Sequence, residues 1–122
     1  MSAGSTDSAF VRGARLFDRG AFFEAHEAWE DPWRAETDET ARRFFQGLIQ
    51  VAAALHKLLI MESPGPASRV FARGLAKLDA CPADFTREGG FDLPAFRVAV
   101  HGCADALAAG RFDRAAIPVM LP

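Results

Sequence analysis

The stretch from Glu39 to about Met61 constrains the fold most, because it is predicted to form a long helix that is apolar around almost its whole circumference. One face carries large apolar side chains, namely Phe44, Leu48, Val51 and Leu55. The other side carries small residues that leave room for another helix to approach, namely Gly47, Ala53 and Ala54. A helix that is apolar on both sides has to be covered on both sides, so this segment is predicted to be the centre of a bundle.

Proline, glycine and capping residues divide the rest of the chain into helical segments and leave almost no plausible strand. The predicted helices cover about Ser8 to Arg19, Ala21 to Asp31, Glu39 to Met61, Pro66 to Ala80 and Leu93 to Gly110. Asp7 is the expected N-cap of the first helix, Gly20 forms a tight hairpin to the second, and Pro32 is expected to interrupt the second. The predicted fold class is all-α: a single-domain bundle of about five helices, built from helical hairpins around a central long helix.

The length of the chain fits one domain. Its 122 residues, half of them hydrophobic, can bury about two-thirds of the surface that the unfolded chain exposes. Residues 1–7 are expected to be a disordered lead-in, and residues 8–122 are expected to form the helical domain. The irregular end of the chain is expected to pack Ile117, Val119 and Leu121 onto the bundle.

Charge and hydropathy limit the partners and the location. Fourteen basic and 16 acidic residues are interspersed, giving a net charge of −2, so no basic surface for nucleic acid is predicted. The longest charge-free apolar run, Phe44 to Leu55, is shorter than the about 20 residues that cross a bilayer, so no membrane partner is expected. The start of the chain lacks a signal peptide pattern, and Cys81 and Cys103 are isolated, as is typical of reduced thiols. The sequence therefore predicts a cytoplasmic protein.

The seven residues from Glu24 to Glu30 concentrate the chemistry of the chain, with three carboxylates and one of the three histidines. On a helix, His26, Glu27 and Glu30 share one face with Phe23 and Arg34. The central helix carries two amides in its apolar middle, Gln46 and Gln50. Buried amides need partners, so one of the two is expected to hydrogen-bond to Glu27 or Glu30. The sequence thus predicts a polar site between the second and third helices.

One interpretation of this site is a metal centre. The string His26-Glu27-Ala28-Trp29-Glu30 is similar to the H-E-x-x-H motif of zinc proteases, with glutamate in place of the second histidine. His26 and Glu30 would then be metal ligands, Glu27 the general base, and His56 or His101 the third ligand. The same residues suit magnesium or manganese, so the identity of the divalent metal stays open. The corresponding function is a metal-dependent hydrolase acting on an unidentified small-molecule substrate.

A second interpretation uses the same residues for structure alone. Arg34, Arg42 or Arg43 could neutralise Glu27 or Glu30 in a buried network. Trp29 and Trp33, four residues apart, are then expected to anchor the helical hairpin in the core. In this interpretation the chain is a non-enzymatic helical interaction or self-association module, with a homodimer as one form. No nucleophilic serine motif, phosphate-binding glycine loop or C-x-x-C pair occurs that would favour another chemistry.

Three runs of the sequence, Phe17 to Glu30, Trp33-Arg34 and Phe45 to His56, resemble the small bacterial and archaeal family called domain of unknown function 309. The resemblance covers about residues 10–80. It implies an all-helical, orthogonally packed bundle, and it implies the description usually given to such sequences, a predicted metal-dependent hydrolase. The motif positions that the resemblance assigns to this chain are Glu24, His26, Glu27, Trp29, Glu30, Trp33, Arg34, Gln46, Gln50 and His56.

Overall fold

The computed structural model describes residues 7–122, and every regular element in that part of the chain is a helix. The helices are α1 (Ala9–Asp18), α2 (Phe22–Ala35), α3 (Glu39–Leu59), α4 (Pro64–Asp79) and α5 (Leu93–Ala108), followed by a short 3₁₀ helix, η1 (Arg114–Ala116). The predicted all-α bundle of five helices is confirmed. Of the predicted lead-in, residues 1–6 lie outside the described residues.

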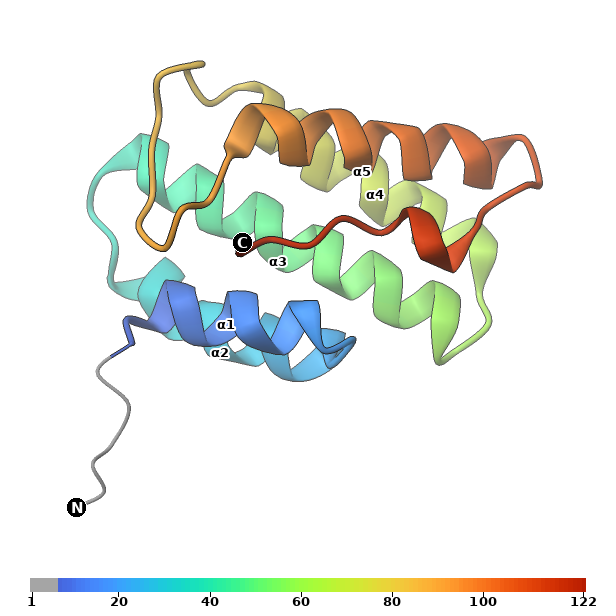
Figure 1. Ribbon diagram of the computed structural model, residues 1–122, viewed down its shortest axis with the longest axis horizontal. Helices are drawn as coiled ribbons and strands as arrows, with labels where there is room; N and C mark the ends of the chain where they lie inside the picture. Colours follow the sequence, from blue (N-terminus) through green and yellow to red (C-terminus); the bar gives the residue numbers. More distant parts are fainter. Residues whose placement is uncertain (1–6) are drawn as a thin grey trace.

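Helix α3 lies at the centre of the bundle, as its composition predicts. Figure 1 shows α1 and α2 paired on one side of α3, and α4 and α5 on the other. The predicted large apolar face is buried, with Phe44, Leu48, Val51 and Leu55 all at most 2% exposed. Helix α3 therefore lies between the α1–α2 pair and the α4–α5 pair. None of the helices in the described part of the chain is long and apolar enough to span a membrane.

The contact between α3 and α4 depends on two glycines that face each other. A Cβ atom at Gly74 would lie 3.0 Å from the backbone oxygen of Gly47, and one at Gly47 would lie 2.8 Å from a methyl carbon of Leu78. Both distances are shorter than side-chain contacts normally allow. The absence of side chains here lets the two backbones approach closely, which confirms the predicted role of Gly47.

The α1–α2 hairpin is held by Trp29, which is 0% exposed. Its indole Nε1 donates a hydrogen bond to the backbone oxygen of Phe10 at 3.1 Å. The ring fits because position 13 is glycine, where a Cβ atom would lie 2.2 Å from Nε1. Between the helices, Gly20 adopts a φ of +81°, which favours glycine. Trp29 thus anchors the hairpin in the core, as predicted.

Several predicted helix ends differ from the structure. Pro32 does not interrupt α2, which continues to Ala35, because a proline this close to the end removes only one backbone hydrogen bond. Ser8, rather than Asp7, caps α1 by accepting a hydrogen bond from the backbone N–H of Val11. Asp7 instead pairs with Arg15 at 2.7 Å. Helix α4 begins at Pro64, since the first turn of a helix does not need the missing proline N–H.

Helix α3 ends two residues before the predicted Met61. The backbone N–H of Ser63 donates to the Lys57 oxygen at 2.9 Å, and Glu62 adopts a φ of +52°. This is the arrangement in which a residue in the left-handed region closes a helix. The closing turn leaves Ile60 and Met61 outside the helix, where their side chains are 60% and 56% exposed.

The segment after η1 returns across the bundle and is fixed to α1 (Figure 1). The Asp18 carboxylate accepts hydrogen bonds from the backbone N–H groups of Met120 at 2.6 Å and Leu121 at 3.0 Å. This anchor turns Met120 into the core, at 3% exposed. Ile117 and Leu121 pack against the core as predicted, but the prediction for Val119 was wrong, because its side chain is 70% exposed.

The two cysteines are buried and free, as expected of isolated thiols. Their sulfurs lie near backbone oxygens, Cys81 Sγ at 3.6 Å from Lys77 and Cys103 Sγ at 3.5 Å from Ala116. Burial raises the pKa of both thiols, so the reactive thiolate is disfavoured at neutral pH. Both cysteines therefore act as small packing residues.

Candidate functional site

Helix α2 distributes the predicted site residues around its circumference rather than gathering them at one place. Trp29 lies in the core, Glu24 and Glu27 are exposed, and His26 and Glu30 are half-buried at the edge. No hydrogen bond or ion pair within residues 7–122 involves Glu27, the predicted general base. The carboxylates of α2 therefore do not form a buried cluster.

The contacts between His26 and its neighbours are loose. His26 Nε2 lies 3.7 Å from a Glu30 oxygen, and Arg34 lies 3.9 Å from the same oxygen. Exposed one-turn pairs of this kind contribute only about 0.3–0.5 kcal/mol each. His26 Nδ1 is buried and has no hydrogen-bond partner. The predicted neutralisation of Glu30 by Arg34 is present, whereas Arg42 lies over the Trp33 ring and Arg43 pairs with Glu39.

The predicted hydrogen bond between the central amides and α2 was wrong. Gln50 accepts a hydrogen bond from the Lys77 amine of α4 at 2.9 Å, and no bond joins Gln46 or Gln50 to Glu27 or Glu30 in the described structure. Gln50 lies on the α4 side of α3, because its Cβ atom is 3.1 Å from where a Cβ atom of Gly74 would be. The Gln50 amide thus faces α4 and not α2.

The histidines of α2 and α3 both lie beside one aromatic ring, that of Phe23. The Phe23 ring is stacked near His26, with ring centres 6.0 Å apart, and lies 5.4 Å from the His56 ring. Beside these rings is a hollow of about 270 Å³. Its lining consists of Phe23, His26, Ala53, His56, Lys57 and Met61.

A second hollow of about 450 Å³ adjoins the first, since both are lined by Phe23 and His56. It is also lined by Gly20, Ala21, Phe22, Glu24 and Ile60. We call the combined region the α2/α3 surface, defined by Phe23, Glu24, His26, His56, Lys57, Ile60 and Met61. Phe23 is 47% exposed at its centre. The α2/α3 surface is thus an indented, largely apolar region with ionisable groups at its edges.

The predicted metal ligands do not meet the requirements of a metal centre. Zinc is usually held by at least three protein ligands, but residues 7–122 contain no group of three histidine, cysteine, aspartate or glutamate side chains that could hold an ion. His26 and His56 both lie beside the Phe23 ring, and they form no such group with Glu30. His101 pairs instead with Asp79 at 2.8 Å, between α5 and α4. The residues present do not fit a catalytic divalent ion, so no hydrolytic step is derived from them.

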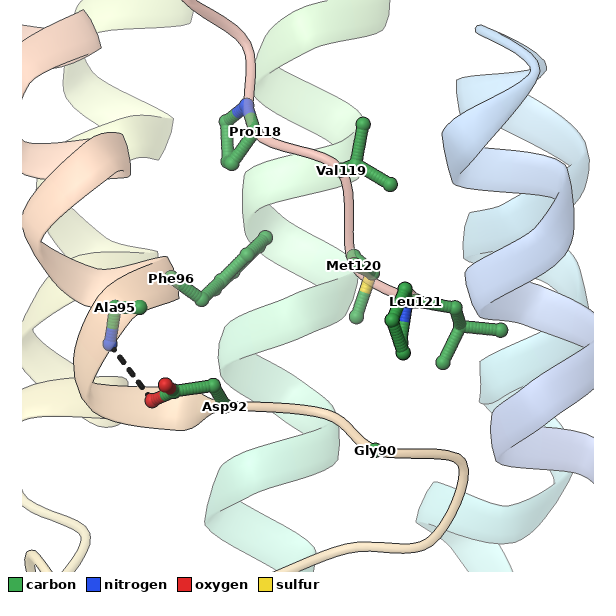
Figure 2. Close-up of a pocket in the computed structure, with 9 residues that line it drawn as sticks. Gly90, Asp92, Ala95, Phe96, Pro118, Val119, Met120 and Leu121 are labelled. Atoms are coloured by element: carbon green, nitrogen blue, oxygen red, sulfur yellow. Dashed lines mark hydrogen bonds between the residues drawn. The ribbon is translucent and has the colours of Figure 1, made fainter.

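A third hollow of about 390 Å³ lies between the start of α5 and the end of the chain. Figure 2 shows Phe96 and the segment from Pro118 to Leu121 around it. Asp92 carries the one ionisable side chain in its lining, and that carboxylate caps α5 by accepting a hydrogen bond from the Ala95 N–H at 3.0 Å. This hollow offers no free polar group for chemistry.

Comparison with known families identifies the chain. The profile described as "Domain of unknown function (DUF309)" matches residues 10–78. The chain belongs to the DUF309 family. An uncharacterized protein of Aquifex aeolicus (strain VF5) is 30% identical over 69 residues, which are 57% of this chain and 20% of that relative. The chain therefore matches about a fifth of the length of that protein.

The DUF309 match contains α2 and α3 completely, all of α1 except its first residue and all of α4 except its last residue. The whole α2/α3 surface lies inside it. Sequence reasoning about this family member placed His26 and His56 near a site but missed Lys57, Ile60 and Met61. The sequence held no signal for Ile60 and Met61, because apolar residues at the end of a predicted helix are expected to be buried.

Proposed function

We propose that this DUF309 protein is a non-enzymatic helical recognition module that binds another protein chain through its α2/α3 surface. The observation that carries the proposal is the gathering of exposed apolar side chains. Five large apolar side chains are exposed in the described part of the chain, and three of them, Phe23, Ile60 and Met61, belong to this one surface. Grouped apolar side chains around indentations are typical of protein interfaces, because each leaves water only when a partner covers it.

The chemistry of the surface also favours recognition over hydrolysis. The two imidazoles lie beside a phenyl ring and belong to no group of three potential metal ligands within residues 7–122, and Glu27 is exposed and lines neither hollow. Aromatic and methionine side chains are enriched at interfaces, and charged groups at an interface rim set orientation.

Site-specific photo-cross-linking in the native host tests the proposal. A photoreactive phenylalanine analogue replaces Phe23, and the matched control carries the analogue at Val98, which is more exposed but lies on α5 outside the surface. Position 23 is expected to give a covalent adduct with one defined protein, identified by mass spectrometry and reconstituted with purified components. Position 98 is expected to give none. Equal labelling from both positions, or no adduct from position 23, would overturn the proposal.

Metal titration tests the alternative function, a metal-dependent hydrolase. The purified protein is titrated with zinc, manganese and magnesium by calorimetry. The recognition function predicts no stoichiometric binding, because two loosely placed donors are too few for a tight site. One ion bound per chain, and lost in both His26→Ala and His56→Ala, would contradict the proposal and favour the metal-dependent hydrolase.

A further inference from the structure

We infer that the chain that binds the α2/α3 surface is a second copy of this protein, related to the first by a two-fold axis. The inference rests on the proposed function and names the partner of the same surface. It is carried by the placement of charge, because the surface has one carboxylate and one amine besides its two imidazoles, and the carboxylate and the amine are beside different hollows.

Lys57 and Glu24 are the two opposite charges. Lys57 lines the smaller hollow and not the larger one, whereas Glu24 lines the larger hollow and not the smaller one. Neither forms an ion pair with another residue in the described structure. Phe23 and His56, which line both hollows, lie between them. The surface therefore presents an unpaired amine, two shared aromatic rings in the middle and an unpaired carboxylate in order.

Such an order is complementary to itself. In a two-fold interface, if residue i of one copy contacts residue j of its partner, then residue j contacts residue i by symmetry. Facing two α2/α3 surfaces with the axis near Phe23 places Lys57 of each copy opposite Glu24 of the other. The pair of Lys57 and Glu24 then forms twice in one interface, and every charge in it has one partner. A partner with only acidic or only basic residues would satisfy one of the two and repel the other.

The apolar side chains fit the same arrangement. Ile60 and Met61 project from the end of α3 beyond its last helical residue, and each lines one of the hollows. A two-fold axis near Phe23 brings the protruding Ile60 and Met61 of one copy toward the hollows of the other. Each hollow, at about 270 and 450 Å³, exceeds the volume of one aliphatic side chain. Apolar protrusions and apolar indentations thus alternate on a single surface, as an interface between identical copies requires.

Sedimentation equilibrium of the purified full chain tests the inference through a charge-reversal cycle. The wild-type protein is expected to reach about 26 kDa, twice the chain mass of 13.2 kDa. Glu24→Lys and Lys57→Glu each place like charges opposite one another twice, so each is expected to raise the dimer Kd about tenfold or more. The double variant Glu24→Lys/Lys57→Glu restores opposite pairs and is expected to return the Kd to within about threefold of wild type. The matched control Glu39→Lys makes the same charge change away from the surface and should leave the Kd unchanged.

The outcomes separate this inference from the proposed function. A wild-type dimer with restoration in the double variant supports the second copy. A wild-type monomer at every concentration, or a dimer indifferent to both charge reversals, overturns it. If the monomeric protein still cross-links from position 23 to a different protein, the recognition function stands and only the identity of the partner changes. A monomer without any cross-link overturns both.

Discussion

At the residue scale, the packing of α1 against α2 requires both the large side chain of Trp29 and the absence of a side chain at Gly13. The indole of Trp29 occupies the space where a side chain at position 13 would begin, with three of its ring atoms within 2.6 Å of the Cβ position. The same indole bonds the backbone of Phe10, so it cannot move away without losing that hydrogen bond. Packing and hydrogen bonding together fix the distance between α1 and α2.

Gly13→Ala is therefore expected to lower the free energy of unfolding by about 1–3 kcal/mol, the usual cost of overpacking. Urea unfolding followed by tryptophan fluorescence measures this change. Gly102→Ala is the matched control, because Gly102 also lies in a helix but has no atom within 4 Å of its Cβ position. That control is expected to stabilise the protein by up to about 1 kcal/mol, as alanine does in helix interiors. Similar effects in both variants would show that Trp29 does not limit position 13.

At the scale of elements, the carboxylate of Asp18 in α1 fixes the irregular segment after η1 to the bundle. Asp18→Ala removes the acceptor for the N–H groups of Met120 and Leu121. The expected result is a loss of about 1–3 kcal/mol of stability, because hydrogen bonds to a charged group contribute about that much. Faster hydrogen exchange should be confined to residues 117–121. Asp18→Asn, which keeps one acceptor oxygen, is expected to be intermediate, and unchanged exchange in the alanine variant would contradict this role.

The helices themselves follow closely from the sequence, whereas their ends and polar contacts do not. Caps and apolar periodicity predict local backbone preference, so the central position of α3 and the α1–α2 hairpin could be predicted. Pro32 lies inside α2 because tertiary packing of the helix outweighs one lost hydrogen bond. The Gln50 amide finds its partner in Lys77, which is 27 residues away in sequence. Helix caps and apolar periodicity do not predict a contact between residues so far apart in the sequence.

At the scale of the whole molecule, the carboxylates of α2 do not form a cluster, and the candidate site is the surface between α2 and α3. His26 and His56 could be placed there from the sequence, because they lie on neighbouring helices. Ile60 and Met61 could not, since apolar residues at the end of a predicted helix indicate burial rather than exposure. Their exposure results from the turn closed by Ser63 and Glu62, which is a property of the fold.

We expect the exposed side chains of Ile60 and Met61 to serve binding rather than folding, and a double variant of these two residues tests this role. Ile60→Ser/Met61→Ser is combined with the photoreactive analogue at position 23, and the yield of cross-linked adduct is measured beside the urea midpoint. Because both side chains are mostly exposed, the free energy of unfolding is expected to stay within about 1 kcal/mol of the parent. The adduct is expected to fall at least about tenfold. A full yield of adduct, or a destabilised protein that still cross-links, would show that Ile60 and Met61 do not serve binding.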